Sequence, residues 1–126
     1  MAHILVIEDE ESVRTMIREM LSRAGHAVEE AADGEAGLEA FRRQPPDLVI
    51  TDILMPNKGG LVAIKEIRQS RPTARIVAIS GGGRTGRMNF LSTARTFPGV
   101  LTLQKPFRRS KLLKLIDQAL AAPSPV

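Results

Sequence analysis

The chain has 126 residues, which is long enough for one domain with its own hydrophobic core. It has no cysteine, which excludes disulfides and cysteine-ligated zinc, and no apolar run approaches the roughly 20 residues that cross a bilayer. The net charge of +4 is uneven, because residues 1–60 hold 12 acidic and 6 basic residues whereas residues 61–126 hold 2 and 12. We therefore expect a cytoplasmic domain with two faces of opposite charge and no membrane partner.

The first apolar run, residues 4–7, predicts a buried strand that ends in four consecutive acids, residues 8–11. Acids are favoured at the start of a helix, and together with Ser12 they predict that a helix begins here. Apolar residues then recur at helical spacing as far as Ala24, and Gly25 ends the helix. The first strand is thus followed by a helix, with acids at the junction.

The next strand is weaker, with small apolar residues only at the two ends of residues 27–32. Asp33 and Gly34 predict a turn or cap, from which a second helix continues to Pro45. A strongly apolar run at residues 48–50 then predicts a buried strand.

This third strand ends at a single carboxylate, Asp52, and Pro56 with the glycines after it predicts a loop. A third helix follows, whose apolar stripe contains Leu61, Ile64 and Ile67, with Val62 as a further candidate.

The second half repeats the alternation of strand and helix. Residues 74–79 predict a fourth strand that ends at Ser80, a glycine-rich loop follows at residues 81–86, and a short helix covers residues 88–94. A fifth strand, residues 100–103, leads to Lys105, and the last helix contains apolar residues from 112 to 120.

Five strands that alternate with five helices predict an α/β fold, in which right-handed crossovers give a mostly parallel sheet covered on both faces. We assign residues 1–121 to this domain and expect residues 122–126 to form a flexible tail.

The polar residues at the strand ends form a specific set. The carboxyl ends of parallel strands meet at one edge of the sheet, so three carboxylates, a hydroxyl and an ammonium are expected there. Three adjacent carboxylates need a counter-charge, which a hard cation such as Mg²⁺ or Mn²⁺ supplies together with the ammonium. Such a site would let one carboxylate attack a phosphoryl group. The five residues are Glu8, Asp9, Asp52, Ser80 and Lys105.

The order and spacing of these residues resemble the receiver domains of two-component response regulators. The resemblance covers roughly residues 3 to 120 and is carried by four pieces: Ile4-Leu5-Val6-Ile7-Glu8-Asp9-Glu10, Asp52-Ile53-Leu54-Met55-Pro56, Ser80, and Lys105-Pro106-Phe107. It implies a flavodoxin-like sheet with strand order 2-1-3-4-5. It also implies that the protein is a regulatory phosphoacceptor that assists its own phosphorylation and dephosphorylation, and not an enzyme in the usual sense.

The resemblance assigns a role to each residue of the set. Asp52 would accept a phosphoryl group from a sensor histidine kinase or a phosphotransfer protein. Mg²⁺ would bind Asp9, Asp52 and the backbone carbonyl of Leu54, with Glu8 reaching it through water. Ser80 would be the switch hydroxyl and Lys105 the phosphate partner, followed by a cis bond to Pro106.

One position departs from the family pattern. Receiver domains usually carry Tyr or Phe three residues before the lysine, whereas this chain has Thr102 there and no Tyr or Trp at all. The common aromatic switch therefore cannot operate, and we expect the glycine-rich loop at residues 81–86 to take part in signal output instead.

The basic second half predicts an output face that binds an acidic protein partner, with a second copy of the chain as a further candidate. Its residues would be Arg84, Arg87, Arg95, Arg108, Arg109 and Lys111. A nucleotide- or nucleic-acid-binding module is the alternative, since residues 81–86 match G-x-G-x-x-G. We rank it lower, because no acid follows about 20 residues later and aromatic stacking residues are nearly absent.

Overall fold

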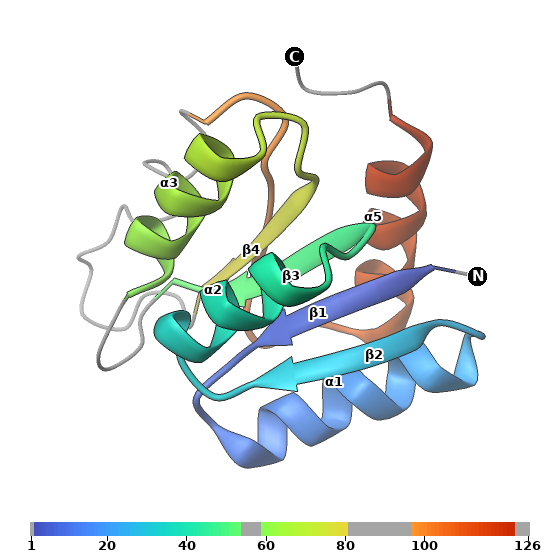
Figure 1. Cartoon of the computed structure of the whole chain (residues 1–126). Coiled ribbons are helices and arrows are strands. Elements are labelled where there is room, and N and C mark those ends of the chain that lie inside the picture. The colour runs from blue at the N-terminus through green and yellow to red at the C-terminus, as the bar shows by residue number, and fades with distance from the viewer. Residues whose placement is uncertain (1, 54–58, 81–96, 123–126) are drawn as a thin grey trace.

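The computed structural model describes residues 2–53, 59–80 and 97–122. In these residues a five-stranded parallel sheet forms the centre of the molecule, with strand order β2-β1-β3-β4-β5 (Figure 1). This confirms the predicted α/β, flavodoxin-like architecture. The strands are β1 (His3–Ile7), β2 (Ala27–Ala31), β3 (Leu48–Asp52), β4 (Ile76–Ser80) and β5 (Leu101–Gln104).

The described helices cover the sheet on both sides. Helices α2 (Gly34–Arg43) and α3 (Gly60–Ser70) lie against one face, and α1 (Glu11–Arg23) and α5 (Arg109–Ala121) lie against the other (Figure 1). The predicted fourth helix and the glycine-rich loop fall within residues 81–96, which lie outside the described residues. Among the described helices, none is both long and apolar enough to cross a membrane.

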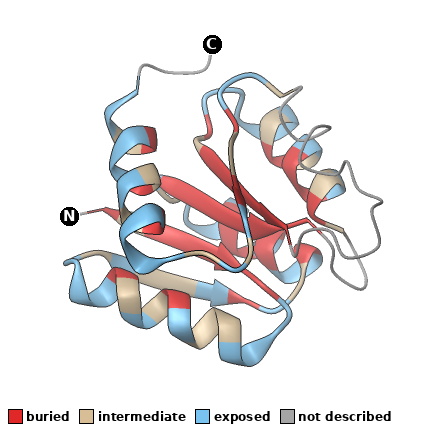
Figure 2. Ribbon diagram, turned by 180° about the vertical axis from the view of Figure 1, so that it is seen from behind, coloured by how far each residue is buried: buried red, intermediate tan, exposed pale blue. Residues whose placement is uncertain are grey.

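Two hydrophobic cores lie on the two faces of the sheet, because successive side chains of a strand point to opposite sides. In β1, Leu5 and Ile7 pack with α2 and α3, whereas Ile4 and Val6 pack with α1 and α5. Every residue of β3 and β4 is buried, and these strands run through the middle of the molecule (Figure 2). Burial of each Leu or Ile side chain contributes about 1.5–3 kcal/mol, so the central strands are held in fixed positions.

The helix ends confirm one predicted cap and correct another. Asp33 caps α2 as expected, since its side chain accepts a hydrogen bond from the backbone N–H of Ala36 at 2.8 Å. Gly25 follows α1 with a φ of 94°, a backbone angle that favours glycine. Ser12, however, does not cap α1: the helix begins at Glu11, and Glu10 is the N-cap residue.

Two other expectations differ from the structure. Strand β2 covers Ala27–Ala31 and includes Glu29 and Glu30, so it ends one residue before the predicted strand at residues 27–32. These residues are held by the ladder to β1. Val62 is 49% exposed, so it is wrong to place it in the apolar stripe of α3, which is formed by Ala63, Ile64 and Ile67. The Lys105–Pro106 bond is cis, as the resemblance implied.

Candidate functional site

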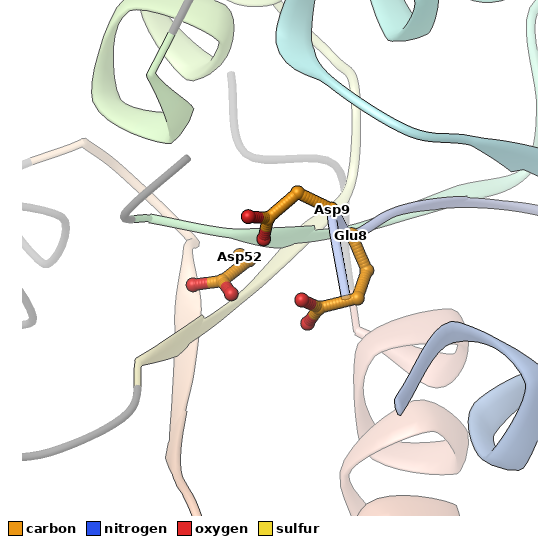
Figure 3. Close-up of side chains that lie close together, drawn as sticks. All are labelled: Glu8, Asp9 and Asp52. Carbon is orange, nitrogen blue, oxygen red and sulfur yellow. The ribbon is translucent and has the colours of Figure 1, made fainter. Parts of the chain in front are cut away.

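Three carboxylates meet where β1 and β3 end. These strands are parallel neighbours with Ile7 paired to Thr51, so Glu8 and Asp9 follow β1 beside Asp52 at the end of β3. One oxygen from each of the three carboxylates lies within 4.8 Å of the others (Figure 3). Glu8 and Asp52 are only 1% and 5% exposed, whereas Asp9 is exposed to solvent. The predicted convergence of the three acids is therefore found in the structure.

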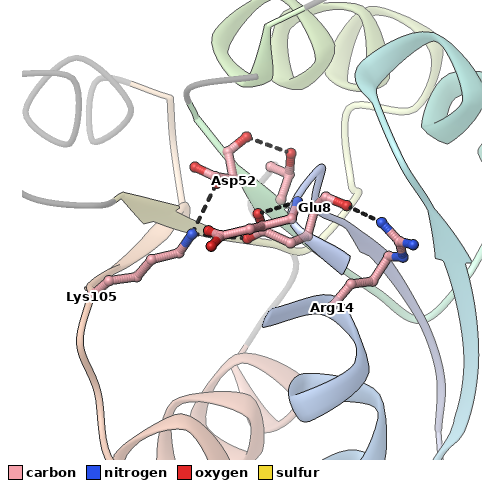
Figure 4. Close-up of polar contacts among 6 residues, drawn as sticks. Glu8, Arg14, Asp52 and Lys105 are labelled. Atoms are coloured by element: carbon pink, nitrogen blue, oxygen red, sulfur yellow. Dashed lines mark hydrogen bonds and ion pairs between the residues drawn. The ribbon is translucent and has the colours of Figure 1, made fainter. Parts of the chain in front are cut away.

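An ammonium group lies between the two buried acids. The Nζ atom of Lys105 is 3.0 Å from Oε1 of Glu8 and 3.0 Å from Oδ2 of Asp52 (Figure 4). Lys105 follows β5, and its backbone N–H donates to the carbonyl of Ser80 at 2.7 Å, which holds it beside the end of β4. The lysine thus reaches the carboxylates of β1 and β3 from the far side of β4.

Burial and the neighbouring charges shift the pKa values of Glu8 and Lys105. Burial, with the negative charge of Asp52 as the second cause, raises the pKa of Glu8 from an ordinary value of 4.5 to about 7. Burial alone would lower the pKa of Lys105, but the two carboxylates more than offset this effect, and its pKa is raised. Lys105 therefore stays protonated at neutral pH, while Glu8 titrates close to neutrality.

The arrangement fits a hard cation. The oxygens of Asp9, Asp52 and Glu8 form an all-oxygen donor set, which favours Mg²⁺ or Mn²⁺ over zinc. Both oxygens of Glu8 already have partners, Lys105 at one and the backbone N–H of Glu10 at the other. Asp9 and Asp52 are therefore the residues best placed to bind a cation directly, and Glu8 is better placed to act through Lys105 or a water.

Comparison with known proteins identifies the family. A sequence profile of the response regulator receiver domain matches residues 4–117. The chain belongs to this family. It is 35% identical over 124 residues to the chemotaxis protein CheY of Bacillus subtilis. The aligned residues cover 95% of this chain and 99% of that protein.

Solved receiver structures have the same fold. The receiver domain of NtrX from Brucella abortus superposes with a TM-score of 0.87 at 30% identity, covering 95% of this chain and 99% of that one. The chemotaxis protein CheY4 of Vibrio cholerae gives a TM-score of 0.84 at 27% identity, covering 94% and 98%. Receiver domains are signalling switches that interact with histidine kinases or phosphotransfer proteins and typically bind Mg²⁺ at an acidic cluster.

The remaining predicted residues of this receiver domain fall into three groups. Ser80 is 6% exposed at the end of β4, whose neighbour in the sheet is β3, so it shares the edge of Asp52. Arg108, Arg109 and Lys111 are exposed around the start of α5. Leu54, Arg84, Arg87 and Arg95 lie outside the described residues.

Two residues near the site were not singled out by the sequence. Arg14 of α1 donates a hydrogen bond to the carbonyl of Glu8, although its position on a charged helix gave no indication of this contact. Gly60 begins α3 directly against the backbone of β3, where a Cβ would lie 2.5 Å from the Cα of Ile53. The sequence placed Gly60 in the loop after Pro56 and gave no sign of this close approach, whereas in the structure Gly60 is the first residue of α3.

Proposed function

We propose that this receiver domain is a phosphorylation-controlled signalling switch in which Asp52 accepts a phosphoryl group from a phosphohistidine, with Mg²⁺ as cofactor. The donor would be a sensor histidine kinase or a phosphotransfer protein. The observation that carries the proposal is the position of Lys105, whose ammonium lies 3.0 Å from Asp52 beside an acidic cluster that can hold a cation.

In the transfer, an oxygen of the Asp52 carboxylate attacks phosphorus and forms a new O–P bond. The N–P bond of the donor breaks, and the histidine leaves with the electron pair and takes up a proton. The ammonium of Lys105 already contacts one Asp52 oxygen, so it is placed to neutralise charge on the phosphoryl group. Bound Mg²⁺ would add charge neutralisation at the transferring oxygens.

The signal would end by hydrolysis of the acyl phosphate. Water attacks phosphorus, the acyl phosphate bond breaks, and Asp52 returns to a carboxylate as inorganic phosphate leaves. Ser80, buried at the end of the neighbouring strand, would donate a hydrogen bond from its hydroxyl to the phosphoryl group while that group is bound. The protein would thus assist its own phosphorylation and dephosphorylation while serving a regulatory role in the cytoplasm.

The output partner would bind the basic surface near the start of α5. Arg108 and Lys111, with Thr102 and Phe107, line a groove of about 420 Å³ beside β5. Exposed cations beside this groove favour an acidic protein partner, and a second copy of the chain is the other candidate.

Intact-mass measurement tests the phosphoacceptor role. After incubation with Mg²⁺ and acetyl phosphate, the wild type should gain one phosphoryl group and Asp52→Asn should gain none. Asp47→Asn is the matched control, because Asp47 precedes the same strand and its side chain contacts the N–H of His3 rather than the site. Failure of the wild type to gain mass, or equal gains in wild type and Asp52→Asn, would contradict the proposal.

A further inference from the structure

Arg14 connects the acidic site to the outer strand of the sheet. Its Nη1 atom donates a hydrogen bond of 2.7 Å to the backbone carbonyl of Glu8, and its Nε atom lies 3.3 Å from Oε1 of Glu30 on β2 (Figure 4 shows the first contact). The Arg14 side chain is only 17% exposed. A hydrogen bond from a charged donor is roughly twice as strong as a neutral one, so this contact can fix a backbone group.

The carbonyl that Arg14 binds belongs to the peptide that leads into Asp9. The other polar groups of Glu8 are also bonded: its N–H donates to the carbonyl of Ala31, and its two carboxylate oxygens contact Lys105 and the N–H of Glu10. Glu8 is therefore fixed at every polar atom. Among the described residues, Arg14 is the one whose side chain bonds the Glu8–Asp9 peptide from outside the sheet.

Asp9 needs this support more than the other acids do. Glu8 and Asp52 are buried and paired with Lys105, whereas Asp9 is exposed, and within the described part of the chain no side chain or backbone group bonds its carboxylate. Its position close to Asp52 therefore depends on its backbone, which the Glu8–Asp9 peptide orients.

We propose that Arg14 is a positioning residue for the cation site: it fixes the Glu8–Asp9 peptide and so keeps Asp9 close to Asp52. Glu30 orients the guanidinium in turn, since its carboxylate accepts a hydrogen bond from Arg14 and forms an ion pair with Arg18. This inference rests on the proposed function, because it assigns Arg14 to the cation site that the phosphoryl transfer uses.

Arg18 provides a matched control. Its Nε atom lies 3.1 Å from Oε2 of Glu30, so Arg14→Ala and Arg18→Ala each remove one ion pair to the same carboxylate. Only Arg14→Ala also removes the bond to the Glu8 carbonyl. A role confined to stability would leave the Mg²⁺ affinity of both folded variants unchanged, whereas a positioning role would weaken Mg²⁺ binding in Arg14→Ala alone.

The experiment is an NMR titration of each variant with Mg²⁺, which follows the amide signals of Asp9 and Asp52. We expect Arg14→Ala to bind Mg²⁺ about tenfold more weakly than the wild type, at the lower end of the range for residues that orient metal ligands. Arg18→Ala should stay within about twofold, because an exposed ion pair contributes little. Arg14→Lys should fall between, since an ammonium can reach the carbonyl but lacks the planar fork.

Urea unfolding without Mg²⁺ accompanies the titration and should show a larger loss of stability in Arg14→Ala than in Arg18→Ala, because only Arg14→Ala loses the bond to the Glu8 carbonyl. Wild-type affinity in Arg14→Ala, or a loss no larger than that of Arg18→Ala, would overturn the inference. The wild type separates this failure from failure of the proposed function: if it neither binds Mg²⁺ nor takes up a phosphoryl group, the proposed function falls and the inference falls with it.

Discussion

Acids and bases of the same kinds meet at two places on this sheet, with different consequences. At the carboxyl ends of β1 and β3, Glu8 and Asp52 share the ammonium of Lys105, and the Glu8 side chain is 2% exposed. Along the outer strand β2, Glu30 pairs with Arg14 and Arg18, and its side chain is 35% exposed. The outer strand also carries Glu29, which pairs with Arg43 and lies 3.6 Å from the imidazole of His3.

Burial, and not the choice of residues, accounts for the difference. An exposed ion pair is screened by water and contributes about 1 kcal/mol or less. A buried carboxylate loses its hydration, which raises the pKa of Glu8 to about 7 and makes the cluster respond to a proton, a cation or a new phosphoryl charge. The ion pairs along β2 connect this strand to the helices beside it. The ion pairs of Lys105 with Glu8 and Asp52 form a site whose net charge can change.

The largest loss of stability is expected from adding a side-chain atom at Gly60, where α3 packs against the carboxyl end of β3. A Cβ at Gly60 would lie 2.9 Å from the carbonyl carbon of Asp52 and closer still to its oxygen, so Gly60→Ala should destabilise the fold by about 3 kcal/mol. The Cβ of Gly59→Ala would meet only the Ile53 carbonyl oxygen at 3.7 Å, and this variant should stay within about 0.5 kcal/mol. Urea unfolding measures both, and equal stabilities would show that this end of the sheet is not tightly packed.

The pH dependence of stability tests the buried charge. Because the folded pKa of Glu8 is raised to about 7 from 4.5, the folded state binds its proton more tightly, and this contribution to stability is lost as pH rises through that window. Relative to Glu8→Gln, which cannot ionise, the wild type should lose up to about 3 kcal/mol between pH 4.5 and 7. Urea unfolding at several pH values with EDTA measures the difference, and a constant difference across the window would contradict the assignment.

The two kinds of ion pair can be compared directly by removing their cations. Lys105→Ala removes the ammonium that both buried carboxylates contact and should lower the free energy of unfolding by about 2 kcal/mol at pH 8. The loss should shrink at pH 6, where Glu8 can take up a proton. Arg43→Ala, which removes a 61% exposed partner of Glu29, should cost about 0.5 kcal/mol or less at both pH values. Similar losses of unfolding free energy in Lys105→Ala and Arg43→Ala would show that the buried and the exposed ion pairs do not differ.

The sequence predicted the parts of the site that follow directly from strand order. Buried apolar runs end at Glu8, Asp52 and Ser80, and parallel strands bring their carboxyl ends together, so these residues could be found without coordinates. The fold followed from the same alternation of strand and helix. Lys105 was identified because it comes directly after the fifth apolar run.

The sequence could not reveal contacts that depend on how elements pack. The bond from Arg14 to Glu8 depends on the rotation of α1 against β2, which helical spacing alone does not set. Ser12 has a residue type that suits a cap, but α1 begins one residue earlier, at Glu11.

The most direct test of the central claim is to locate the phosphoryl group on the chain. After incubation with Mg²⁺ and acetyl phosphate, borohydride reduces an acyl phosphate to an alcohol, so a phosphorylated aspartate becomes homoserine and peptide mass mapping identifies its position. We predict that the reduced residue is Asp52 and no other acid. Reduction at Asp9 or Glu8, or a borohydride-resistant phosphate on a serine, would contradict the account.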